Sequence, residues 1–210
     1  MKGAMPRTAT AWIAVVTALF WLIPTVLGFN DSLATALGFI PDRLNGAVVL
    51  GPAVPAFLTP LTATLVHAGL IHVGMNLLIL AWCGSQVERI LGAKALVFLY
   101  GVSAYTAAML QLLVTPHSQV PMVGASGAIS GVIGAFALSF GQQKQIVQSH
   151  SLNRALNAAW LLAAWVVLQM MTGFLAGTQG VLVATPAHVG GFLSGLLLQR
   201  PLLMWRWRKA

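Results

Sequence analysis

The sequence predicts an all-α integral membrane protein: a bundle of six transmembrane helices with both termini on the inner side. The chain has 210 residues, of which 58% are apolar and only 7% are charged, too few charges to cover a soluble domain of this size. The segments 8–30, 44–87, 95–143 and 155–199 contain no Asp, Glu, Lys or Arg, and a spanning helix needs about 20 apolar residues. We therefore expect one membrane domain, residues 1–210.

The first apolar run, 11–29, follows Lys2 and Arg7. A cleaved signal peptide is the alternative, but its apolar region usually has only about 7–15 residues, so we expect a retained helix. Residues 30–64 contain four prolines, which exclude a straight span and predict a long loop at the membrane face. Prolines and glycines divide the remaining runs into further spans, expected at 65–87, 95–115, 124–141, 156–173 and 186–203.

The basic residues set the expected orientation. With the N-terminus inside, ten of the eleven Lys and Arg residues fall in inner segments, and only Arg43 falls outside, as the positive-inside rule requires. The net charge of +8 therefore does not indicate nucleic-acid binding, because the basic residues flank the spans. Spans two, four and six all run inward, so polar residues near their starts share one depth close to the outer face.

Span four begins with a serine among glycines, in the stretch 121–131. Ser126 follows a loop bounded by Pro116 and Pro121 and precedes a long apolar run, so it lies in the first helical turn, where free N–H groups meet negative charge. A serine nucleophile needs a base, and His188 at the start of span six is the candidate. Taken alone, the stretch 121–131 would favour a role in helix packing rather than in catalysis, since Ser and Gly are common at the interfaces between transmembrane helices.

Spans two and six add polar residues at the same depth. On span two, His72 and Asn76 are four residues apart, so they share a helix face and can both donate hydrogen bonds. His67 should point about 140° away from His72 on a helix, and we expect a structural role for it. On span six, the spacing of His188, Gly191 and Gly195 places them on one face.

Helix faces lined by small residues on spans four and six should bring Ser126 and His188 together. Gly124, Gly127, Gly131 and Gly134 make such a face, with Ser126 at its border, and small residues let two helices approach closely. No acid is placed to orient His188, so the sequence predicts a Ser–His dyad rather than a triad.

Three motifs together resemble the bacterial, six-span type of the rhomboid family of intramembrane serine proteases. They are His67-x-x-x-x-His72-x-x-x-Asn76, Gly124-Ala125-Ser126-Gly127 and Ala187-His188-x-x-Gly191-x-x-x-Gly195. They occur in the family's order, with the family's topology, and the resemblance covers essentially the whole chain.

The resemblance implies a serine endopeptidase that cleaves transmembrane segments of membrane proteins near the outer face. Ser126 would be the nucleophile and His188 the general base, while His72, Asn76 and the Ser126 backbone N–H would form the oxyanion hole. The implied partners are transmembrane substrates and the lipid bilayer of a bacterial plasma membrane, with no nucleic acid. The resemblance also implies small residues before the cut, span five as a lateral gate and residues 173–185 as a cap.

The chain departs from the family pattern in three places. The aromatic residue that often packs on the base histidine is replaced by Ser130, which leaves the support of His188 unassigned. The Trp-Arg pair of the first loop is absent, and Arg43 stands alone. The Glu-x-Arg motif after span two reads Glu88, Arg89 and Ile90.

Two other functions fit an apolar bundle with buried polar residues. A transporter or proton channel would use the histidines as relay groups, but such sites usually lie near the midplane of repeated halves, and this chain has no internal repeat. A non-catalytic rhomboid-like binding protein would typically lack the serine or the histidine. We expect no cofactor and no metal site, since the single cysteine, Cys83, lies in an apolar run as a core residue.

Overall fold

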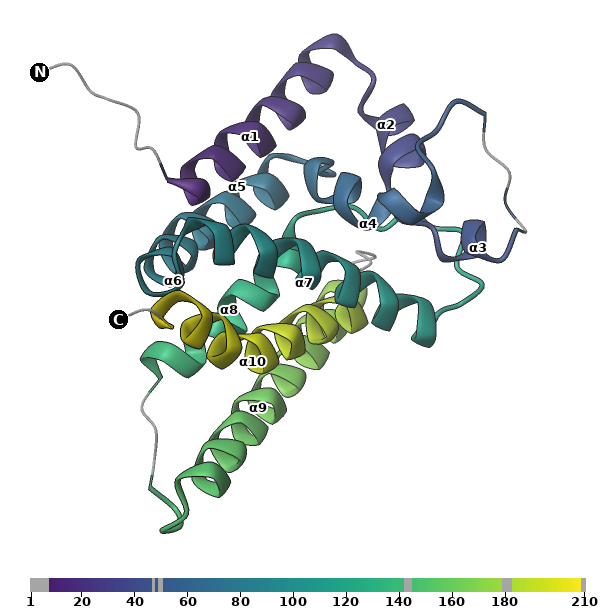
Figure 1. Cartoon of the computed structure of the whole chain (residues 1–210). Helices are drawn as coiled ribbons and strands as arrows, with labels where there is room; N and C mark the ends of the chain where they lie inside the picture. Colours follow the sequence, from purple (N-terminus) through teal and green to yellow (C-terminus); the bar gives the residue numbers. More distant parts are fainter. Residues whose placement is uncertain (1–7, 47, 49–50, 142–144, 179–182, 209–210) are drawn as a thin grey trace, which may run out of the picture.

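The computed structural model describes residues 8–46, 48, 51–141, 145–178 and 183–208, which form a helical bundle without a β-strand within these ranges (Figure 1). The long helices are α1 (Ala9–Leu27), α7 (Ala93–Val114), α8 (Ser126–Phe140), α9 (His150–Thr178) and α10 (Thr185–Trp207). A further long helix is built from α5 (Leu70–Ile79), the π-helical turn η3 (Leu80–Gly84) and α6 (Ser85–Leu91). The predicted all-α membrane bundle is confirmed.

The predicted loop 30–64 is a chain of short helices. It contains α2 (Asn30–Leu37), α3 (Pro41–Leu44), η1 (Ala56–Leu58) and α4 (Thr59–Thr62), followed by the single turn η2 (Ala63–Leu65). Pro41 and Pro60 lie in the first turns of α3 and α4, where a missing N–H costs nothing. The second span begins five residues later than predicted, because Gly69 is fully extended and ends the irregular segment before α5.

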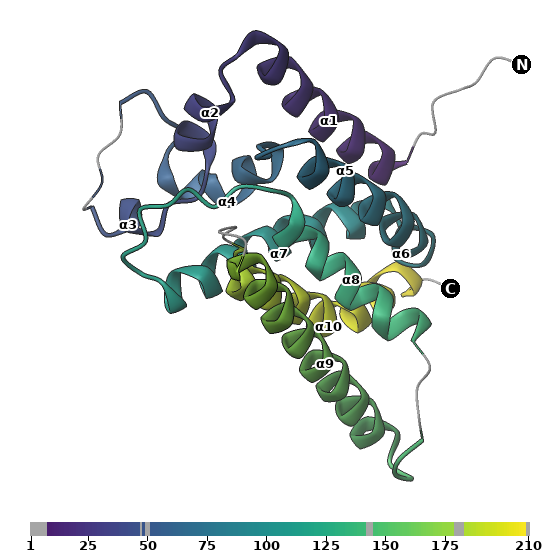
Figure 2. The same ribbon diagram turned by 180° about the vertical axis from the view of Figure 1, so that it is seen from behind.

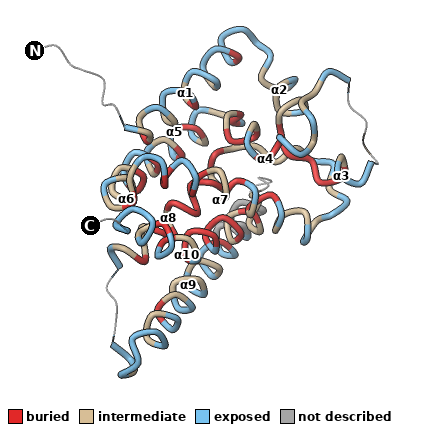
Figure 3. The backbone as a smooth tube through the Cα atoms, in the orientation of Figure 1, coloured by how far each residue is buried: buried red, intermediate tan, exposed pale blue. Residues whose placement is uncertain are grey.

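Helices α7, α8 and α10 form the centre of the bundle, and buried residues are concentrated there (Figure 3). Viewed from behind, α8 runs beside α10 (Figure 2). The two helices are parallel, since Gly127 lies against Gly191 and Gly131 lies against Gly195. Helix α7 is antiparallel to both, and the hydroxyls of Ser103 and Ser194 are 2.7 Å apart between α7 and α10.

The parallel contact requires glycine on α10. A Cβ built at Gly191 would overlap the carbonyl oxygen of Gly127, and one at Gly195 would overlap the carbonyl oxygen of Gly131. These contacts are backbone against backbone, so no side chain can move aside to relieve them. The i, i+4 spacing places both glycines on the same face of α10, as the sequence predicts.

Four helices of the described residues are long and apolar enough to cross a membrane, namely 9–27, 70–91, 93–114 and 150–171. Helix α8 has 15 residues, about 22 Å in length, whereas the hydrocarbon core is about 30 Å thick. Helix α10 contains polar residues such as Gln199 and Arg200. Helix α8 lies among other helices and is buried over much of its length, so it does not need a fully apolar surface. The count of six spans and their orientation remain predictions.

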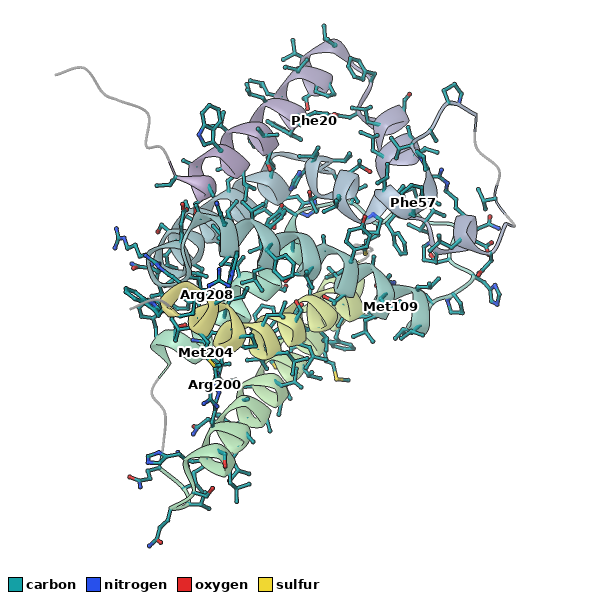
Figure 4. All side chains as sticks on the ribbon, viewed as in Figure 1. Phe20, Phe57, Met109, Arg200, Met204 and Arg208 are labelled. Carbon is teal, nitrogen blue, oxygen red and sulfur yellow. The ribbon has the colours of Figure 1, made fainter. Side chains whose placement is uncertain are left out.

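Many large apolar side chains are exposed on the outside of the bundle, as expected of a surface that faces lipid. Large side chains such as Phe20, Phe57 and Met109 are 40%, 65% and 57% exposed and point outward from their helices (Figure 4).

The start of α1 and the end of α10 lie at the same end of the bundle. The Glu88 carboxylate accepts hydrogen bonds from the N–H groups of Ala9 and Thr10 and from the Thr10 hydroxyl, at 2.6–2.9 Å. A carboxylate at a helix N-terminus is favourable because free N–H groups carry positive partial charge. Arg206 donates to the carbonyl oxygens of Glu88 and Arg89, which joins α10 to the same corner.

We predict that Gly195→Ala destabilises the protein by about 1–3 kcal/mol, the usual cost of overpacking, because the added methyl meets the α8 backbone. Gly101→Ala is the matched control: a Cβ at Gly101 would meet only the end of the Leu61 side chain at 4.0 Å. Thermal unfolding in detergent compares the two. Equal melting temperatures for both variants would show that α8 and α10 can separate at little cost.

Candidate active site

The loop before α8 is held by three parts of the segment that precedes α5. Phe39 and Met122 exchange two backbone hydrogen bonds of 3.0 and 2.8 Å. The Gly124 N–H donates to the carbonyl oxygen of Ala63 at 2.9 Å, and the Ala125 N–H donates to Nε2 of His67 at 3.3 Å. Ser126 is the next residue, so these bonds fix where the serine enters its helix.

Gly124 is required in this loop for two reasons. Its φ of +115° is a conformation that side chains disfavour. A Cβ at this position would also lie 2.6 Å from Nε2 of His72. Glycine therefore allows both the turn into α8 and the close approach of the His72 ring.

Ser126 and His188 are in hydrogen-bond contact, although 62 residues separate them in the chain. Ser126 Oγ lies 2.7 Å from Nε2 of His188, and both side chains are partly buried. Each residue stands at the start of its helix, on α8 and α10, so the parallel register of these helices brings the two together.

Helix α9 supplies the other contacts of His188. Gln169 Oε1 lies 2.7 Å from Nδ1 of the ring, and Trp165 Nε1–H donates to the His188 carbonyl oxygen at 3.2 Å. Trp165 and Gln169 are four residues apart, hence on one face of α9. Trp165 also stacks on Phe192, with ring centroids 4.8 Å apart.

His72 and Asn76 reach the same region from α5. Both side chains line a cavity of about 870 Å³ together with Ser126, Gln169 and His188. Asn76 is only 5% exposed, and its side-chain N–H₂ has no hydrogen-bond partner among the described residues. Burial of an amide donor without a partner costs free energy of folding. The Asn76 N–H₂ is therefore available to a group bound in the cavity.

The structure differs from the sequence analysis at His67. This residue is not on the helix that carries His72, because α5 begins only at Leu70, so the 140° separation does not apply. The two rings lie 5.0 Å apart, edge to face. His67 is 2% exposed and accepts from the Ala125 N–H, a position beneath the serine loop rather than in the cavity lining.

Sequence reasoning missed Gln169, the contact of His188 on α9. The available signal was an amide deep in the uncharged apolar run 155–199, since polar groups at membrane depth are usually functional. The small Ser130, which stands where the family often has an aromatic residue, donates to the Ser126 carbonyl oxygen at 2.8 Å. Gly191 packs against Ser130, so the backbone of α10 lies where an aromatic side chain at position 130 would otherwise be.

The remaining predicted residues lie around this site. Gly124 and Gly127 line the cavity, whereas Gly191 and Gly195 lie in the contact between α8 and α10. The predicted cap, residues 173–185, lies partly outside the described residues. Among the residues that the structure describes, no group of three or more His, Cys, Asp and Glu side chains is close enough to hold a metal ion.

Several known proteins are similar to this chain. RHOMBOID-like protein 5 of Arabidopsis thaliana is 27% identical over 97% of the chain and 71% of its own length. Rhomboid protease GluP of Bacillus subtilis is 25% identical over 92% of the chain, which spans 34% of that relative. Rhomboid-like protease 3 of Toxoplasma gondii is 28% identical over 89% of the chain and 66% of its own length.

The family model described as the Rhomboid domain matches residues 56–205. This range contains the Ser126–His188 contact, the cavity-lining residues His72 and Asn76, and all of α7, α8 and α9. With a match over more than half of its length, the chain belongs to the rhomboid family.

Proposed function

We propose that this protein is an intramembrane serine endopeptidase that cleaves transmembrane segments of membrane proteins near the outer face, with Ser126 and His188 as a catalytic dyad. The observation that carries the proposal is the 2.7 Å contact between Ser126 Oγ and His188 Nε2 inside a cavity. Two relatives named as proteases, from Bacillus subtilis and Toxoplasma gondii, support the same reaction class.

The dyad chemistry follows from the positions of the two atoms. As Ser126 Oγ attacks the scissile carbonyl carbon, its proton passes to His188 Nε2, and an electron pair moves onto the carbonyl oxygen. His188 then gives the proton to the leaving nitrogen as the C–N bond breaks, which releases one product and leaves an acyl-serine. Water then attacks the carbonyl carbon of the acyl-serine and gives a proton to His188. His188 passes the proton to Ser126 Oγ as the second product leaves, which frees Ser126.

Donors that meet the developing oxyanion come from two helices. Ser126 is the first residue of α8, so its N–H is free of intrahelical bonding and the helix dipole favours negative charge there. The Asn76 amide and the His72 ring line the same cavity. Preorganised donors are most effective where water competes little, and this cavity is lined mainly by apolar and neutral residues.

The environment of the site sets the substrate class. The helices around it expose apolar side chains, which suits delivery of a substrate through the bilayer, as we infer for a bacterial plasma membrane. A peptide bond in a transmembrane helix is shielded by its own hydrogen bonds, so the substrate must unwind locally before Ser126 can attack. The whole chain, residues 1–210, would act as one membrane domain with no added cofactor.

A non-catalytic binding protein is the alternative within the family. Such a protein would use the cavity to hold a transmembrane partner without an activated serine. Covalent labelling by a serine-reactive phosphonate distinguishes the two, because a binding protein would leave the probe unreacted.

We predict that Ser126→Ala and His188→Ala each abolish cleavage of single-span membrane proteins in co-expression, with little further loss in the double variant. Nucleophile and base act as one unit, so their losses are not additive. Cleavage products and phosphonate labelling are measured at matched amounts of folded protein. Substantial cleavage by either single variant would remove the dyad from the mechanism.

We predict that Asn76→Ala slows cleavage by about 10²–10³-fold, the usual effect of losing one oxyanion donor, while phosphonate labelling still occurs. The remaining donors, His72 and the Ser126 N–H, make the loss partial. The rate constant and the melting temperature are measured together.

The competing role for Asn76 is an ordinary interhelical hydrogen bond, worth about 0.6 kcal/mol. Asn157→Ala, on α9 and also buried, is a control for the loss of a buried amide. A near-normal cleavage rate for Asn76→Ala, or a loss that only tracks unfolding, would assign Asn76 to packing.

A further inference from the structure

Gln169 places its side-chain oxygen on the ring nitrogen of His188 that faces away from Ser126. Oε1 of Gln169 and Oγ of Ser126 each lie 2.7 Å from His188, on Nδ1 and Nε2 respectively. Gln169 is 6% exposed, so little water competes for this bond. The three side chains form a continuous line from α9 through α10 to α8.

This line fixes the position of the ring proton. An amide oxygen only accepts hydrogen bonds, so Nδ1 of His188 must carry the hydrogen. A neutral imidazole has one N–H, hence Nε2 has the free lone pair and the Ser126 hydroxyl donates to it. This is the tautomer that can take a proton from serine; the opposite tautomer would point a hydrogen at Oγ.

We propose that Gln169 is a positioning residue for His188, a neutral third member that holds the base in its accepting tautomer and its ring toward Ser126. This inference rests on the proposed protease function and adds a residue to it. The acid of a Ser-His-Asp triad performs the same orienting role. Trp165, one turn away, holds the His188 backbone through its carbonyl oxygen, so one face of α9 fixes both parts of the residue.

The charged groups of the chain explain why an amide has this position. Asp42 accepts from Gln119 at 3.0 Å and lies near His117, and Glu88 binds the start of α1. Neither of these two carboxylates is therefore available to His188. A neutral acceptor also avoids the cost of burying a charge, although it stabilises the protonated ring less than a carboxylate would.

Two variants separate orientation from packing. Gln169→Leu keeps the approximate size but removes the acceptor, and we expect kcat to fall at least about tenfold with KM unchanged. Gln169→Glu keeps an oxygen at the same place and should retain more activity than Gln169→Leu. Asn157→Leu is the matched control: it replaces another buried amide of α9, about 18 Å along the helix from Gln169, and should leave kcat unchanged.

The ring tautomer provides a second measurement that packing alone would not change. Nitrogen-15 NMR of the wild-type protein with labelled histidine, assigned by the signals lost in His188→Asn, should show His188 protonated on Nδ1. In Gln169→Leu the population should move toward the Nε2-protonated form. A wild-type ring protonated on Nε2 would overturn the proposal, even if no Gln169 variant folds.

The outcomes separate this inference from the proposed function. If the wild type cleaves, Ser126→Ala does not, and Gln169→Leu behaves like Asn157→Leu, the role of Gln169 is wrong and the protease stands. If the wild type neither cleaves nor reacts with phosphonate, the protease function fails, and the tautomer spectrum alone decides whether Gln169 orients His188.

Discussion

The active-site geometry depends on how closely two parallel helices approach each other. Glycines at 191 and 195 let the backbone of α10 touch the backbone of α8 at Gly127 and Gly131. Any side chain at these positions would push the helices apart by more than a hydrogen bond can stretch. The Gly191 contact lies about one helical turn from His188. The register of α8 and α10 that it sets therefore also places Ser126 beside His188. The same contact that stabilises the bundle therefore brings Ser126 and His188 together.

The long segment before α5 gives the second constraint. It pairs with the serine loop through Phe39 and Ala63, and His67 accepts the N–H directly before Ser126. A loop residue at the start of a helix would otherwise be free to fray. These bonds hold Ser126 from one side, while His188 on α10 contacts it from the other. The segment thus acts as a scaffold for the site and not only as a connection between spans.

Sequence reasoning recovers the parts of this design that periodicity and charge encode. Charge-free runs indicate where the long helices of the described residues lie, although α5 begins five residues after the predicted start at 65 and α9 begins six residues before the predicted start at 156. The inward direction of three predicted spans places His72, Ser126 and His188 at one depth. Sequence reasoning fails where the chain is irregular: Gly69 is extended and directly precedes α5, so His67 lies in irregular chain outside the helix that carries His72. It also misses Gln169, because periodicity gives the faces of a helix but not which face meets α10.

Helix α9 has a different relation to the site than α8 and α10 have. It packs mainly against α10, and its contribution to the site comes from Trp165 and Gln169, which bind the backbone and the ring of His188. Glycine contacts hold Ser126 near His188 independently of α9. Without the α9 contacts, Ser126 and His188 would still lie at the starts of neighbouring helices, but the His188 ring would lose the acceptor on Nδ1. The approach of Ser126 to His188 and the hydrogen bond on the other ring nitrogen are thus set by separate helices.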